Sequence, residues 1–102
     1  MKEFNSIDEI SEDTYFIFKH SVTCPISAGA NDVVNSVESE LEIPIYLIIV
    51  QKSRELSDNI AKHFRIGHES PQLLLIKDGR VVWDKSHYSI RAKEIRNAVD
   101  NL

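Results

Sequence analysis

The chain has 102 residues, of which 42% are hydrophobic and 27% are charged, and its formal net charge is −4. This length suits one hydrophobic core, so we expect residues 1–102 to form a single domain. The Lys and Arg residues are interspersed with acids rather than clustered, which argues against nucleic acid as a partner.

The apolar runs and the cysteine content of the chain indicate the cellular compartment in which we expect it. The longest apolar run, IPIYLIIV at 43–50, is too short to cross a bilayer, which takes about 20 apolar residues. The N-terminal MKEFNSIDEI has acids where a signal peptide would be apolar. The single cysteine and the four scattered histidines lack the paired spacing of a zinc site. We therefore expect a cytoplasmic protein with no membrane partner, no bound metal and no resident cofactor.

The N-terminal half predicts a short helix, a strand and a longer helix. The short helix falls around Ser6 to Ile10, and the aromatic run YFIF at 15–18 is typical of a buried strand. Apolar residues then recur at helical spacing, namely Ile26, Ala30, Val33 and Val37. Proline is common in the first turn of a helix, so Pro25 indicates that Cys24 lies at or just before the helix N-terminus.

The C-terminal half predicts a strand, a helix, a hairpin and a final helix. IPIYLIIV is apolar on both faces, as in a central parallel strand. SRELSDNIAKHF at 53–64 indicates a helix behind a candidate N-cap, Ser53. Asp-Gly between QLLLI at 72–76 and RVVW at 80–83 is a strong hairpin signal. We expect the last helix to open at Ser89, with an apolar stripe formed by Ala92, Ile95, Val99 and Leu102.

This order of elements indicates an α/β fold. Strand-helix-strand units give parallel neighbours and the hairpin adds an antiparallel pair, so we expect a mixed central sheet with helices on both faces. Reactive sites in such sheets lie at the carboxyl ends of the strands. Cys24 follows the first predicted strand and is expected at that edge.

Two motifs carry a resemblance to a known family. Over nearly its full length the chain resembles a thioredoxin-fold protein, and SPQLLLIKDGRVV at 70–82 is similar to that fold's Ile-Pro-Thr-Leu-Leu-Leu-Phe-Lys-Asn-Gly segment. Pro71 takes the place of the proline that is cis and faces the active cysteine. The pentapeptide TCPIS at 23–27, in a chain of this length, resembles the monothiol bacilliredoxins, also called the YtxJ family.

The resemblance implies a thiol-disulfide oxidoreductase that removes bacillithiol from mixed disulfides on cytosolic proteins. It implies Cys24 as the nucleophile, a second bacillithiol as the co-substrate that resolves the adduct, and a substrate groove at Pro71. Two positions depart from thioredoxin. Ser27 replaces the second cysteine, so an internal disulfide cannot close, and Phe18 stands where thioredoxins usually hold a buried aspartate.

The residues around Cys24 suit this chemistry. Only a thiolate attacks a disulfide, and the N-terminus of a helix favours negative charge. The hydroxyl of Ser27 is a candidate hydrogen-bond donor to the sulfur, and Thr23 is either the N-cap or a substrate contact. We also expect substrate contacts from Pro25, and from the Ser70 backbone, which can pair with an extended peptide.

Cations near the groove would suit the malate carboxylates that bacillithiol carries. Loop position makes Arg65, His68 and His87 candidates, although a solvated surface position is the simpler reading for each. Two other functions stay open at this point. One is a non-catalytic module that holds an extended peptide in the groove, and the other is a carrier of an iron-sulfur cluster between two chains.

Overall fold

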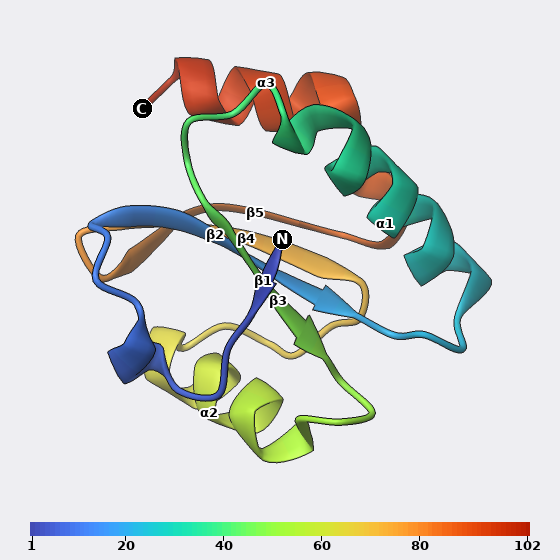
Figure 1. Ribbon diagram of the computed structural model, residues 1–102, viewed down its shortest axis with the longest axis vertical. Helices are drawn as coiled ribbons and strands as arrows, with labels where there is room; N and C mark the ends of the chain where they lie inside the picture. Colours follow the sequence, from blue (N-terminus) through green and yellow to red (C-terminus); the bar gives the residue numbers. More distant parts are fainter.

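A computed structural model describes residues 1–102 as a β-sheet with α-helices on both faces (Figure 1). The strands are β1 Lys2–Glu3, β2 Thr14–His20, β3 Ile45–Ile49, β4 Gln72–Lys77 and β5 Arg80–Ser86. The α-helices are α1 Pro25–Glu38, α2 Arg54–Phe64 and α3 Ala92–Asp100, with short 3₁₀ helices η1 Ile7–Glu9 and η2 His87–Ser89. No helix is long and apolar enough to span a membrane.

The five strands are ordered β1-β3-β2-β4-β5. β1 and β2 both pair in parallel with β3, whereas β4 is antiparallel to β2 and β5 is antiparallel to β4. Helices α1 and α3 cover one face and α2 covers the other (Figure 1). The predicted mixed sheet with helices on both faces is therefore confirmed. The two-residue strand β1 was not predicted, since its pairing depends on the distant edge of β3.

The core lies in two layers because successive side chains of a strand point to opposite faces. Phe16 and Phe18 of β2 pack in the cluster that includes buried residues of α1 and α3. Tyr15 and Ile17 belong instead to the cluster that includes Leu56 and Ile60 of α2. The alternation therefore directs the next odd position of β2, residue 19, toward α2.

Local turn chemistry explains the hairpin. Asp78 and Gly79 have φ values of 52° and 79°, so both central residues of the β4–β5 turn are left-handed. This conformation matches the twist of the flanking strands and favours Asp-Gly. The predicted hairpin is confirmed, and the structure extends its strands to Lys77 and Ser86.

Three helix details differ from the prediction. Helix α3 has Arg91 as its N-cap, whereas Ser89 lies in η2, where the Ile90 N–H donates to His87 O. The apolar stripe of α3 ends before Leu102, which is exposed, because the helix stops at Asp100. In α1, Val34 is fully buried in place of Val33, which is only partly buried against the core.

Candidate active site

Cys24 is the N-cap of α1, with extended backbone at φ −102° and ψ 121°, and Pro25 occupies the first turn. Its carbonyl accepts the Ala28 N–H at 3.0 Å, which begins the helical ladder. The side chain carries a free, partly exposed thiol. The predicted position at the helix N-terminus is confirmed. First-turn N–H groups have no intrahelical acceptor, so Cys24 lies beside unpaired backbone donors at this end of α1.

The proline before β4 lies near the end of β2 from which the loop of Cys24 departs, since β4 is the antiparallel neighbour of β2 and Gln72 pairs with Lys19. The Ser70–Pro71 peptide bond is cis, as predicted, and Pro71 is buried. The hydroxyl oxygen of Ser70 is buried and has no hydrogen-bond partner. Ser70 therefore brings an unpaired polar group to the loop that faces Cys24.

A pocket of about 500 Å³ joins the two segments. It is lined by the loop after β2, the segment after β3, the first two turns of α2 and the loop before β4. The lining residues are Ser21, Cys24, Val50, Gln51, Arg54, Ser57, Asp58, His68 and Ser70. The structure thus brings the predicted Cys24, His68 and Ser70 together at the carboxyl ends of β2 and β3.

Ser27 is fully buried, and its hydroxyl faces the turn before the cysteine. Its Oγ accepts the Ser21 N–H at 2.8 Å and lies 2.7 Å from His20 Nδ1. Burial lowers the pKa of His20, which keeps this imidazole neutral. The expected hydrogen bond from Ser27 to the sulfur of Cys24 is replaced by these two contacts. The hydroxyl holds the turn against α1.

Thr23 is exposed and is not the N-cap, since Cys24 holds that position. Its Oγ1 accepts Gln51 Nε2–H at 3.1 Å, and Ser21 Oγ accepts from the same nitrogen at 2.7 Å. The Val22 N–H donates to Gln51 Oε1 at 3.2 Å. Gln51, which was not predicted, therefore ties the loop of the cysteine to the segment after β3.

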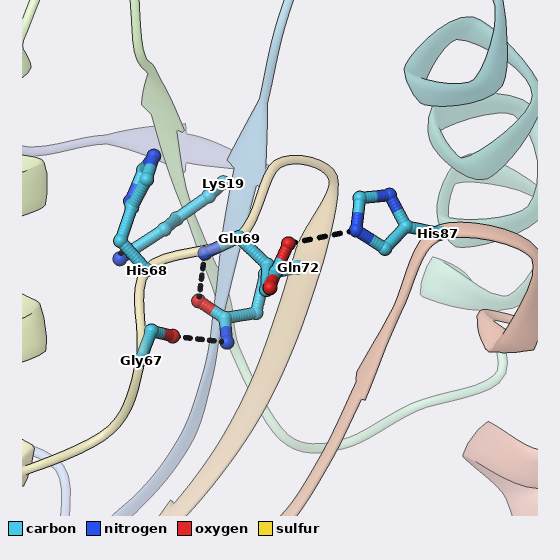
Figure 2. Close-up of polar contacts among 6 residues, drawn as sticks. All are labelled: Lys19, Gly67, His68, Glu69, Gln72 and His87. Carbon is cyan, nitrogen blue, oxygen red and sulfur yellow. Dashed lines mark hydrogen bonds and ion pairs between the residues drawn. The ribbon is translucent and has the colours of Figure 1, made fainter.

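Of the three candidate cations, only His68 lines the pocket. Arg65 is the left-handed C-cap of α2, at φ 54°; it is exposed and is not among the lining residues. His87 is also outside the lining, with Nε2 2.8 Å from Glu69 Oε2 (Figure 2). The charged groups that line the pocket are Arg54 and Asp58, one helical turn apart on α2. Neither residue was predicted as part of the site. The signal in the sequence was their i, i+4 spacing, which places both side chains on the same face of α2.

Lys19 is the charged residue behind the pocket wall. Its side chain is fully buried, as the alternation along β2 requires, and extends toward α2 and the loop of His68 (Figure 2). The ammonium Nζ lies 3.2 Å from Ser57 O and 3.1 Å from His68 Nδ1. Burial lowers the pKa of Lys19 to about 8, and the negative charge of Asp58 opposes this effect. The signal that was missed is a lysine inside the otherwise apolar run YFIFKH.

Gln72 braces the loop that carries His68 and Ser70. Its buried carboxamide donates to Gly67 O at 3.0 Å and accepts the Glu69 N–H at 3.4 Å (Figure 2). These bonds satisfy backbone groups on both sides of His68 and so hold one wall of the pocket in place.

Comparisons with known proteins agree with this geometry. The family model for the monothiol bacilliredoxin BrxC matches residues 1–95. A solved structure described as a candidate oxidoreductase with a thioredoxin fold is 38% identical, with a TM-score of 0.88, and the match covers 96% of this chain and 92% of that one.

Two thioredoxins show the same fold at low identity. The Fasciola hepatica thioredoxin is 16% identical at a TM-score of 0.76, and the match covers 99% of this chain and 98% of that one. Oxidized mitochondrial thioredoxin 3 from Saccharomyces cerevisiae is 11% identical at a TM-score of 0.75, and the match covers 100% of this chain and 95% of that one. The predicted thioredoxin-like α/β fold is confirmed. The chain belongs to the monothiol bacilliredoxin family and is a thiol-disulfide oxidoreductase.

Proposed function

We propose that this protein removes bacillithiol from mixed disulfides on cytosolic proteins, with Cys24 as the nucleophile. The observation that carries the proposal is the position of the only cysteine, partly exposed at the N-cap of α1 in the wall of an open pocket. Membership of the monothiol bacilliredoxin family supports it.

The proposed cycle has two exchanges. The Cys24 thiolate attacks the bacillithiol sulfur of the mixed disulfide, a new S–S bond forms, the old one breaks, and the repaired protein thiol leaves. A second bacillithiol, as thiolate, then attacks the bacillithiol sulfur on Cys24, which releases oxidised bacillithiol and regenerates the Cys24 thiolate. Ser27 cannot replace this second thiol, because its hydroxyl is buried and is not ionised at neutral pH.

The neighbouring residues supply the substrate contacts in this proposal. Thr23 and Pro25 are exposed on either side of Cys24 and offer a surface to the target protein. The Ser70 backbone precedes β4 and can pair with an extended segment by strand addition. Arg54 lines the pocket and can hold a carboxylate of the bacillithiol malate group.

The test uses one target protein that carries a single bacillithiol. The modified target is mixed with bacillithiol and with the wild-type protein, Cys24→Ser or Val22→Ser, and intact mass spectrometry follows the loss of the modification. Val22 is an exposed residue of the same loop and is outside the pocket lining, so its variant controls for loop disturbance. We expect removal by wild type and Val22→Ser only. Equal rates with Cys24→Ser would overturn the proposal.

The identity of the small thiol is tested by the same measurement. The protein is incubated with the oxidised forms of bacillithiol, glutathione and coenzyme A, and the mass of the adduct on Cys24 identifies the partner. We expect a bacillithiol adduct that persists until a reduced thiol is added, since the chain has no second cysteine.

The family assignment bears on one of the two alternative functions and not on the other. A non-catalytic peptide module is not proposed, because the family and its 38% identical relative indicate an oxidoreductase. The iron-sulfur carrier stays a prediction of the sequence alone, and visible absorbance after anaerobic reconstitution of the purified protein tests it.

A further inference from the structure

The buried ammonium of Lys19 is not neutralised by any acid in contact with it. None of the ion pairs in the protein includes Lys19, and its Nζ is bonded to one carbonyl, Ser57 O, and one imidazole, His68 Nδ1. Ser57 and His68 line the pocket that contains Cys24, whereas Lys19 does not. The positive charge therefore lies one side chain behind the pocket wall and reaches the pocket through the imidazole.

These contacts assign the proton on His68. An ammonium has three donors and no acceptor, so Nδ1 of His68 must accept from Lys19 and carry no proton of its own. The remaining proton of the neutral ring is then on Nε2. Partial burial and the charge of Lys19 both lower the pKa of His68, which favours this neutral form.

Other charged groups act on this pair from two segments. Asp58 on α2 and Glu69 in the loop favour positive charge on His68, whereas Arg54 on α2 opposes it. Cys24 lines the same pocket and adds a negative charge when it is ionised. The Lys19–His68 pair therefore lies in a site of mixed charge, with one Lys19 proton in the hydrogen bond between Nζ and Nδ1.

We propose that Lys19 and His68 form a relay that delivers a proton to the thiolate released when Cys24 attacks a disulfide. The inference rests on the proposed exchange at Cys24. As the old S–S bond breaks, its electron pair stays on the leaving sulfur, which takes the Nε2 proton of His68. At the same time Nδ1 takes a proton from the Lys19 ammonium. The products are a thiol, a neutral amine and a neutral imidazole protonated on Nδ1, and water later restores the ammonium and the Nε2–H form.

The acidity of the donor suits this transfer. The pKa of Lys19 is about 8, close to the value of about 8.5 for an ordinary cysteine thiol. Proton transfer between groups of similar pKa is nearly balanced, and a pKa near the working pH is what acid catalysis requires. An exposed lysine at about 10.4 would be a much weaker acid at neutral pH.

The test compares two leaving groups, one that requires a proton as it leaves and one that does not. Wild type, Lys19→Met and His68→Gln are assayed with two disulfides, one releasing a cysteine peptide and one releasing an acidic aromatic thiol that leaves as a stable anion. Alkylation of Cys24 by iodoacetamide measures the nucleophile alone. Lys62→Gln removes an exposed positive charge from α2 outside the pocket lining and serves as the matched control.

We expect both relay variants to slow exchange with the cysteine peptide by about tenfold or more, a low value for a positioned acid. Exchange with the aromatic disulfide and alkylation should change by less than about twofold in the relay variants, and Lys62→Gln should leave the rates with both disulfides unchanged. In wild type, the rate ratio of peptide to aromatic disulfide should fall as the pH rises through about 8.

Three results would overturn the relay. They are unchanged rates in both variants, an equal loss on both disulfides and in alkylation, or a rate ratio that does not vary with pH. Circular dichroism of each variant shows whether it is folded. If Lys19→Met is unfolded, His68→Gln provides the test, because His68 is in an exposed loop position. Activity of Cys24→Ser on either disulfide would instead count against the proposed exchange itself.

Discussion

Replacement of Lys19 by methionine should change the pH dependence of stability in a way that reports the buried charge. The folded protein holds this side chain out of water, whereas the unfolded chain exposes it. Burial lowers the pKa of Lys19 from its ordinary 10.5 to about 8. Methionine fills a similar volume and has no charge, so Lys19→Met removes the titration.

The sign follows from proton binding in the two states. Between pH 8 and 10.5 the unfolded chain keeps the Lys19 proton and the folded protein releases it. Stability gained from this group therefore increases as the pH rises across that window, and is lost as the pH falls toward the folded pKa. Because each pKa unit corresponds to about 1.4 kcal/mol, the full change is about 3 kcal/mol.

Urea unfolding of wild type and Lys19→Met at pH 7, 8, 9 and 10 measures this effect. The hydrogen bonds that methionine loses contribute a constant offset, so only the change of the difference with pH reports the charge. We expect the wild type to gain about 2 to 3 kcal/mol relative to the variant over this range. Lys93→Met, which removes an exposed lysine of α3, controls for net charge. A difference that stays flat with pH would refute the assignment of a buried, charged Lys19.

Two further substitutions test the hydrogen bonds that shape the site. Ser27→Ala should lower the free energy of unfolding by about 1–3 kcal/mol, because the Ser21 N–H loses its acceptor in a buried setting; a loss below about 0.5 kcal/mol in urea unfolding would contradict this. Gln72→Leu should cost about 1–3 kcal/mol and slow disulfide exchange roughly tenfold, because Gly67 O and the Glu69 N–H lose the carboxamide. Exchange at the wild-type rate would show that the loop holds its position without it.

The parts of the fold that were predicted are those whose signals are local. Asp78 and Gly79 determine their turn through their own backbone preferences, and Pro25 marks the start of α1 within one residue. The start of α3 was misplaced because Ser89 has a good capping side chain but lies in the preceding 3₁₀ turn. The choice between Val33 and Val34 depends on how α1 is rotated on the sheet, and apolar spacing alone does not set that rotation.

The site was predicted only in part for a related reason. Cys24 and Pro71 belong to short motifs, whereas Arg54 and Asp58 reach the pocket because α2 packs beneath the sheet with one particular face turned toward it. The burial of Lys19 follows from strand alternation in β2 and from α2 covering that face of the sheet. These two elements are far apart in the sequence, so neither predicts the burial alone. Gln51 was missed because its three hydrogen-bond partners lie in the loop of Cys24, far from Gln51 in the sequence.

The buried hydroxyl at position 27 makes the single-thiol design difficult to reverse. A cysteine introduced there would bring back the second sulfur of a dithiol enzyme, but sulfur is larger and accepts hydrogen bonds poorly. The turn that presents Cys24 would lose its oxygen anchor at the same step, since Ser21 N–H and His20 both depend on it. Two-thiol chemistry at these positions would therefore need a compensating change in residues 20–21, so the single-thiol reaction depends on the framework of the protein as well as on its reactive group.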